Sequence, residues 1–110
     1  MIVEVNESQF RQHMEEKNRF AAFFHTPFCA NCSFARNVLN TVTKRLPIDV
    51  PIVSSNLNVM PTLAEPLQVM TVPLLLFIKD GEPVEQFVAF GRADELYFSL
   101  IHFFGQNEKD

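Results

Sequence analysis

The sequence predicts an α/β protein in which a mixed central sheet is flanked by helices on both faces. Residues 19–24 and 74–78 form runs that are almost entirely apolar, as is typical of central strands covered on both sides. Segments with the apolar spacing of helices lie between the predicted strands. The expected element order is β-α-β-α-β-α-β-β-α. With 110 residues, 47% of them hydrophobic, we expect one domain over residues 1–110.

The first predicted strand and helix are marked by local signals. Residues 1–5 alternate apolar and acidic side chains, as in a short half-buried strand. Asn6 followed by Gln9 resembles a capping box, which predicts a helix that continues to about Lys17. The apolar run 19–24 then forms the second strand.

The middle of the chain is predicted to contain a long helix, a strand and a short helix. The long helix begins at Cys29 and runs to about Arg45. Its expected apolar rows are Phe34, Val38, Val42, Ala35, Leu39 and Leu46. A strand over 52–57 follows, and Pro61 suits the first turn of a short helix that Pro66 limits.

The C-terminal part is predicted to be a hairpin followed by a helix. Residues 79–82 form a tight turn after the second apolar strand, and residues 84–90 pair back, with Pro83 tolerated at the start of an edge strand. Asp94 is expected to cap the last helix. The expected buried stripe of that helix is Leu96, Leu100, Phe103 and Phe104. Residues 106–110 form a polar tail that is expected to fray.

Charge and length exclude several classes of function. Nine basic and thirteen acidic residues give a net charge of −4, which argues against nucleic acid as a partner. The apolar runs are too short to span a membrane. Residues 1–6 do not resemble a signal peptide, so we expect a cytoplasmic protein.

The two cysteines of the chain, Cys29 and Cys32, are separated by two residues and stand where a strand passes into a helix. In the cytoplasm thiols are mostly kept reduced, so such a pair is more often catalytic or metal-binding than structural. The positive end of a helix dipole lowers the pKa of a thiol and raises the fraction of reactive thiolate. We therefore expect catalysis or metal binding at this pair, with Cys29 as the thiol that the helix N-terminus activates.

A Cys-x-x-Cys pair at this junction, in this element order, resembles the thioredoxin superfamily. Val72-Pro73 stands before an apolar strand, where thioredoxins carry a proline in a cis peptide bond. Pro61 and Gly81 also match family positions. The resemblance implies a thioredoxin-like fold and a thiol–disulfide oxidoreductase that needs no cofactor or metal.

The sequence also departs from this family. Thioredoxins have Trp-Cys-Gly-Pro-Cys, whereas this chain has Phe-Cys-Ala-Asn-Cys over residues 28–32. Phe23 stands where thioredoxins bury an aspartate that relays the proton of the second cysteine, and Ser54 stands in place of its lysine partner. The chain therefore resembles a divergent thioredoxin-like protein in which proton transfer from Cys32 is expected to be slow.

The resemblance assigns Cys29 as nucleophile and Cys32 as resolving cysteine in exchange with a disulfide-bearing protein or small thiol. An unidentified reductase or thiol would supply electrons, and we expect a monomer. The expected substrate-binding residues are Phe28, Val72, Pro73, Phe90 and Gly91, with the Val72 backbone pairing an extended substrate segment. His25 is either a proton carrier or a packed residue at the end of a strand.

Two other functions are kept open. Without the buried acid, the domain could be a binding module or holdase with weak turnover. Alternatively, Cys29, Cys32 and His25 could bind zinc or an iron–sulfur cluster, but they supply at most three of the usual four ligands, so such a site would have to bridge a dimer.

Overall fold

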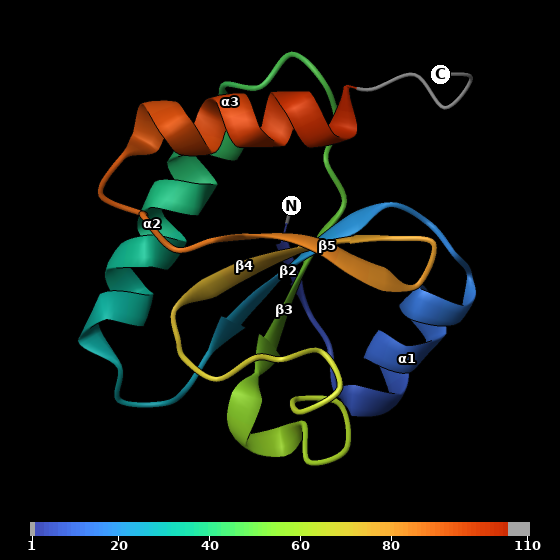
Figure 1. Ribbon diagram of the computed structural model, residues 1–110. Helices are drawn as coiled ribbons and strands as arrows, with labels where there is room; N and C mark the ends of the chain where they lie inside the picture. Colours follow the sequence, from blue (N-terminus) through green and yellow to red (C-terminus); the bar gives the residue numbers. More distant parts are fainter. Residues whose placement is uncertain (1, 106–110) are drawn as a thin grey trace.

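In the computed structural model, which describes residues 2–105, five strands form one mixed sheet in the order β1-β3-β2-β4-β5 (Figure 1). The strands are β1 (Ile2–Glu4), β2 (Phe20–His25), β3 (Ile52–Asn56), β4 (Leu74–Lys79) and β5 (Glu82–Phe87). β3 pairs in parallel with β1 and β2, while β4 pairs antiparallel with β2 and β5. The predicted fold class is therefore confirmed.

The helices α1 (Glu7–Glu15), α2 (Ala30–Lys44) and α3 (Ala93–Phe104) cover the two faces of the sheet, with α1 on one side and α2 and α3 on the other (Figure 1). The central strand β2 explains this layering, because successive side chains of a strand point to opposite faces. Phe20, Ala22 and Phe24 pack in the core on the α1 side. Ala21 and Phe23 pack in the core beneath α2 and α3.

Helix α1 begins with the predicted capping box. The Asn6 side chain accepts the Gln9 N–H, and the Gln9 side chain accepts the Asn6 N–H. The helix ends at Glu15, slightly before the predicted end, because Lys17 adopts a left-handed conformation with a φ of 57° that no α-helix can include.

The first turn of α1 is hydrogen-bonded to the segment before β4. The Glu7 carboxylate accepts hydrogen bonds from the backbone N–H groups of Thr62 (2.8 Å) and Leu63 (3.0 Å). Desolvation of this carboxyl acts to raise its pKa, but the hydrogen bonds from Thr62 and Leu63, together with the nearby Arg11 charge, outweigh it and lower the pKa.

The prediction of a short helix beginning at Pro61 is wrong. A 3-10 helix, η1 (Leu57–Val59), comes before the proline, and residues 61–68 form a series of turns. Pro66 lacks a backbone N–H and disfavours helical geometry in the residue before it, so the segment between the two prolines is too short to repay helix nucleation. Its apolar residues are nevertheless buried in the α1-side core, at Met60, Leu63 and Leu67.

Helix α2 buries only part of the apolar surface predicted for it. Ala35, Leu39 and Val42 are buried against the sheet, and Val38 is partly buried. Phe34 was expected on the buried rows but is 54% exposed. It lies beside the buried stripe because the predicted rows are wider than the face of the helix that contacts the sheet.

The hairpin between β4 and β5 has the predicted tight turn. Asp80 and Gly81 both have positive φ, 55° and 78°, as a two-residue type I′ turn requires. β5 begins earlier than predicted and ends at Phe87 rather than residue 90. Pro83 lies within this edge strand, opposite Ile78 and next to a register irregularity in β4.

The predicted cap of α3 is also wrong. The N-cap residue is Arg92, which makes no side-chain capping hydrogen bond, and Asp94 lies within the first turn, where its negative charge still suits the helix dipole. The expected fraying of residues 106–110 lies outside the described residues. Within residues 2–105, no helix is both long enough and apolar enough to cross a membrane.

Candidate active site

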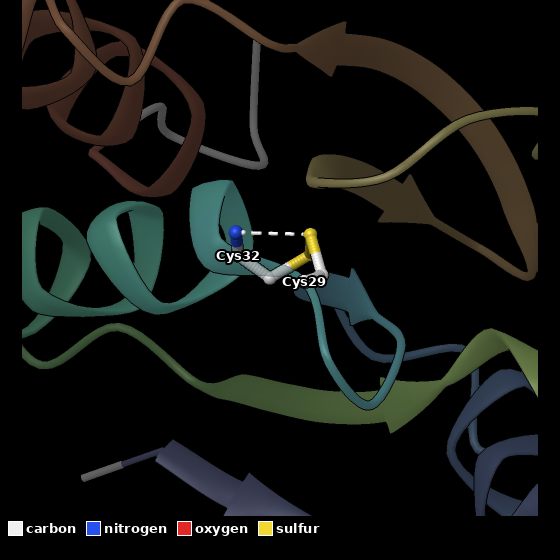
Figure 2. Close-up of a disulfide and its surroundings, with 2 residues drawn as sticks. All are labelled: Cys29 and Cys32. Atoms are coloured by element: carbon white, nitrogen blue, oxygen red, sulfur yellow. Dashed lines mark hydrogen bonds between the residues drawn. A yellow bond between two sulfur atoms is a disulfide. The ribbon is translucent and has the colours of Figure 1, made fainter.

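The two cysteines lie at the predicted junction between a strand and a helix. β2 ends at His25, and Cys29 is the N-cap residue of α2. Cys29 and Cys32 form a disulfide, with their Cα atoms 5.2 Å apart (Figure 2). Cys29 is partly exposed, whereas Cys32 is only 4% exposed. A sulfur at position 29 is therefore accessible to a partner, and a sulfur at position 32 faces the interior.

The Cys29 sulfur accepts a hydrogen bond from the first turn of α2. The backbone N–H of Cys32 donates to the Cys29 Sγ at 3.1 Å, drawn as a dashed line in Figure 2. Hydrogen bonds to a charged group favour the charged form, and the helix N-terminus adds a positive partial charge. A donor N–H at a helix N-terminus is an arrangement that would stabilise a negatively charged sulfur at position 29.

An open pocket of about 570 Å³ surrounds the cysteines. Its lining residues are His25, Thr26, Pro27, Phe28, Cys29, Ala30, Cys32, Ser33 and Arg36. Phe28 projects into solvent and has a left-handed φ of 62°. A left-handed conformation costs a non-glycine residue roughly 1 to 2 kcal/mol. Neither burial of the ring nor the backbone preference of phenylalanine favours this residue at position 28. Its ring instead forms part of the exposed surface beside the cysteines.

The Val72-Pro73 peptide bond is cis, as the resemblance implied. β4 begins immediately after it, and Leu74 pairs with Phe24 near the end of β2. The pairing places residues 72–73 at the same end of the sheet as the loop that leads to Cys29. Val72 and Pro73 are both partly exposed there.

The expected role of Phe90 in an apolar rim does not fit its position. Phe90 is 3% exposed, and its ring lies edge-on to Phe23 (5.8 Å between centroids) and Phe87 (5.5 Å). Its side chain belongs to the core beneath α2 and α3 because the chain turns inward after β5. The neighbouring Gly91 is exposed.

Arg36 is a site residue that the sequence reasoning missed. Phe23 and Ser54 are paired neighbours on β2 and β3, and both are fully buried. The Arg36 guanidinium lies 5.1 Å from the centroid of the Phe23 ring and donates to the Ser54 hydroxyl at 3.1 Å. A cation from α2 thus occupies the region where the resemblance places a buried acid and a lysine. The available signal was its spacing of four residues from Cys32, which puts both on one helix face.

His25 forms a pair with Glu4, a second residue that the sequence reasoning missed. The His25 Nε2 lies 3.0 and 3.2 Å from the two carboxylate oxygens of Glu4. The imidazole stacks near the Phe23 ring, with centroids 5.9 Å apart. A Glu4 oxygen also lies 4.0 Å from the Arg36 guanidinium. Glu4, His25, Arg36 and Ser54 form what we call the polar cluster, next to the cysteine pocket.

Cys29, Cys32 and His25, the residues named for a metal site, do not form one within a single chain. Across residues 2–105, no three His, Cys, Asp or Glu side chains are grouped so that they could hold a metal ion. His25 is directed to Glu4 rather than completing a ligand set with the two cysteines.

Sequence comparisons identify related proteins over most of the chain. The Thioredoxin family model matches residues 1–101. The thioredoxin-like protein YusE of Bacillus subtilis is 36% identical over 85 residues, which cover 77% of this chain and 78% of that protein. A thioredoxin of Staphylococcus epidermidis is 30% identical over 95 residues, which cover 86% of this chain and 90% of that protein.

Solved structures share the fold. A thioredoxin from Trypanosoma brucei brucei superimposes with a TM-score of 0.78 at 17% identity, covering 96% of this chain and 93% of that one. A mutant thioredoxin from Halobacterium salinarum gives a TM-score of 0.76 at 21% identity, covering 93% and 89%. At these identities the superpositions bear on the fold alone.

Proposed function

The chain belongs to the thioredoxin family, and from this premise we propose that it is a thiol–disulfide oxidoreductase with Cys29 as nucleophile and Cys32 as resolving cysteine. One observation carries the assignment of roles. The Cys29 sulfur stands partly exposed at the N-terminus of α2 and accepts the Cys32 N–H, whereas Cys32 is buried. The first sulfur is thus both more accessible and better stabilised as a thiolate.

The proposed reaction has two exchange steps. The Cys29 thiolate attacks one sulfur of the partner disulfide, forms a mixed disulfide and releases the other partner sulfur as a thiolate. Cys32 then loses its proton and attacks the Cys29 sulfur, which breaks the mixed disulfide and releases the second partner thiolate. The partner gains two electrons, and the protein is left with the Cys29–Cys32 disulfide.

The proposed substrate is a disulfide-bearing protein or a small thiol. Phe28 offers an exposed apolar ring beside the cysteines, and the backbone at Val72, with Pro73 and Gly91, offers partly or fully exposed surface. An extended substrate segment would pair with the Val72 backbone by strand addition. We further propose that a reductase or small thiol in the cytoplasm returns the disulfide to the dithiol.

The test is reduction of insulin disulfides with dithiothreitol as electron donor. The parent protein should accelerate precipitation of the insulin B chain. Cys29→Ser should abolish the acceleration, and Ser33→Ala, an exposed substitution in the same helical turn, should retain it. If Cys29→Ser matches the parent, the proposed mechanism is wrong.

The same assay addresses the alternative of a binding module or holdase. A holdase would delay aggregation of insulin chains equally well in the Cys29→Ser variant, whereas an oxidoreductase would accelerate their precipitation.

The direction of the reaction follows from the reduction potential. A value near about −270 mV would indicate a reductant, and one near about −120 mV would indicate an oxidant.

A further inference from the structure

The polar cluster lies beside Cys32. Cys32 lacks the buried aspartate that serves as its proton acceptor in thioredoxins. Cys32 is 4% exposed, and the fully buried residue at position 23 is a phenylalanine. A thiol in such surroundings loses its proton reluctantly, because burial disfavours the charged form. The second exchange step therefore needs a proton acceptor from elsewhere.

We propose that His25, held in place by Glu4, accepts the proton of Cys32 during the resolving step. The inference rests on the proposed function and names the group that supports its second step. His25 follows Phe23 by two residues on β2, so both side chains lie on the face of the sheet that α2 covers. His25 also lines the pocket that contains Cys29 and Cys32.

The hydrogen bonds of His25 set its chemistry. A carboxylate can only accept, so the Nε2 atom that faces Glu4 carries a hydrogen. In a neutral imidazole the other nitrogen, Nδ1, then has a free lone pair and can accept a proton. A water molecule occupies about 30 Å³, so the pocket of about 570 Å³ that His25 shares with both cysteines has room for water.

The charges around His25 are compatible with this role. Glu4 reaches it from β1, and Arg36 from α2 contacts Glu4 at 4.0 Å. The neighbour on β3 is the neutral Asn56, and α2 also contributes the two cysteines. Glu4 compensates the positive charge that His25 acquires, and the positive charge of Arg36 attracts Glu4 from the side of α2. Glu4 and Arg36 are positioning residues, and His25 is the base.

Every proton and electron pair is accounted for in the resolving step. The Cys32 thiol gives its hydrogen to Nδ1 of His25 through the water, and the Cys32 sulfur forms a bond to the Cys29 sulfur. The bond between Cys29 and the partner breaks, and its electron pair leaves with the partner thiolate. The imidazolium then returns its proton to that thiolate or to solvent.

The experiment uses one equivalent of dithionitrobenzoate and the reduced, full-length protein in a stopped-flow spectrometer. The first release of thionitrobenzoate reports attack by Cys29, and the second reports resolution by Cys32. In the parent, the rate of the second phase should rise between about pH 5 and pH 8, where histidines lose their proton. His25→Gln should slow that phase at least about tenfold at pH 7, since a general base contributes roughly 10²- to 10⁴-fold.

Two substitutions distinguish a base from a merely structural residue. His25→Gln should remove the limb between pH 5 and pH 8, so that the second phase keeps rising toward pH 9. Glu4→Gln should slow the second phase near pH 7, because the imidazolium loses its compensating charge, but should keep the limb that His25→Gln removes. The control variants His13→Gln, on α1, and Glu85→Gln, on β5, should reproduce the parent.

The inference is overturned if His25→Gln retains the parent's second phase and its pH dependence. It is also overturned if His25→Gln and Glu4→Gln slow that phase equally at every pH, which would indicate a structural role. Should His25→Gln fail to fold by circular dichroism, a Glu4→Gln variant that resolves at the parent's rate at pH 7 would overturn the inference. Loss of the first phase in the parent would instead refute the proposed function itself.

Discussion

The Arg36→Met substitution tests whether the contacts of Arg36 in the polar cluster stabilise the folded protein. Methionine keeps the linear side chain over Phe23 but removes the guanidinium and its hydrogen bond to Ser54. Because the Ser54 side chain is fully buried, its hydroxyl would lose the hydrogen-bond partner that the structure gives it. Leaving a buried polar group unsatisfied costs about 1 to 3 kcal/mol.

The remaining contacts of Arg36 add less. A cation over an aromatic ring at a partly exposed site contributes about 0.5 to 1 kcal/mol, and the exposed pair with Glu4 about 0 to 1 kcal/mol. A methionine sulfur near the Phe23 ring would offset about 0.3 to 1.5 kcal/mol. We therefore expect Arg36→Met to lower the free energy of unfolding by about 2 kcal/mol.

Urea unfolding of the oxidised protein measures this loss. With a slope of about 1 to 3 kcal/mol/M, the midpoint should fall by about 1 M. The control Arg45→Met, at the exposed C-cap of α2, should cost under about 1 kcal/mol. In a Ser54→Ala background, Arg36→Met should cost at least about 1 kcal/mol less than in the parent. Additivity within about 0.5 kcal/mol would refute the coupling of Arg36 to Ser54.

Three further predictions concern the two cysteines, Phe28 and Glu7. In the reduced protein near neutral pH, iodoacetamide should alkylate Cys29 rapidly and leave Cys32 protected; equal rates by mass spectrometry would remove the assigned roles. Phe28→Ala should raise KM for a protein disulfide severalfold and leave the unfolding midpoint unchanged, with the exposed Phe98→Ala as a control that changes neither. Because the pKa of Glu7 is lowered on folding, its stabilising contribution is present above pH 4.5 and lost as the pH falls through the lowered pKa. Glu7→Gln should therefore flatten the acid limb of the unfolding midpoint, and an unchanged limb would show that other carboxyls dominate it.

The features that sequence predicted correctly are those that depend on neighbours along the chain. The apolar run of β2, the capping box at Asn6 and the turn at Asp80 and Gly81 are each set by a few consecutive residues. The position of Cys29 at the start of α2 follows from such signals as well. Local pattern was therefore enough to place the cysteine pair between its strand and its helix.

Features that depend on contacts between distant segments were missed. Glu4 and His25 look like an exposed acid and a strand-end histidine until the sheet brings β1 and β2 to either side of β3. Arg36 looks like a solvated helix residue until α2 packs over Phe23. Phe90 was expected at the surface because the turn that carries it into the core has no local signature. Long-range pairing of polar side chains leaves no periodic trace in one sequence.

The most direct test of the central claim is capture of the mixed disulfide by the Cys32→Ser variant. Removing the resolving thiol should make the adduct between Cys29 and a disulfide substrate such as insulin accumulate, because only an added reductant can then release it. Non-reducing electrophoresis and peptide mass mapping should locate the bond at Cys29, and the double variant with Cys29→Ser should form no adduct. Absence of any adduct in Cys32→Ser, or an equal amount in the double variant, would contradict thiol–disulfide exchange through Cys29.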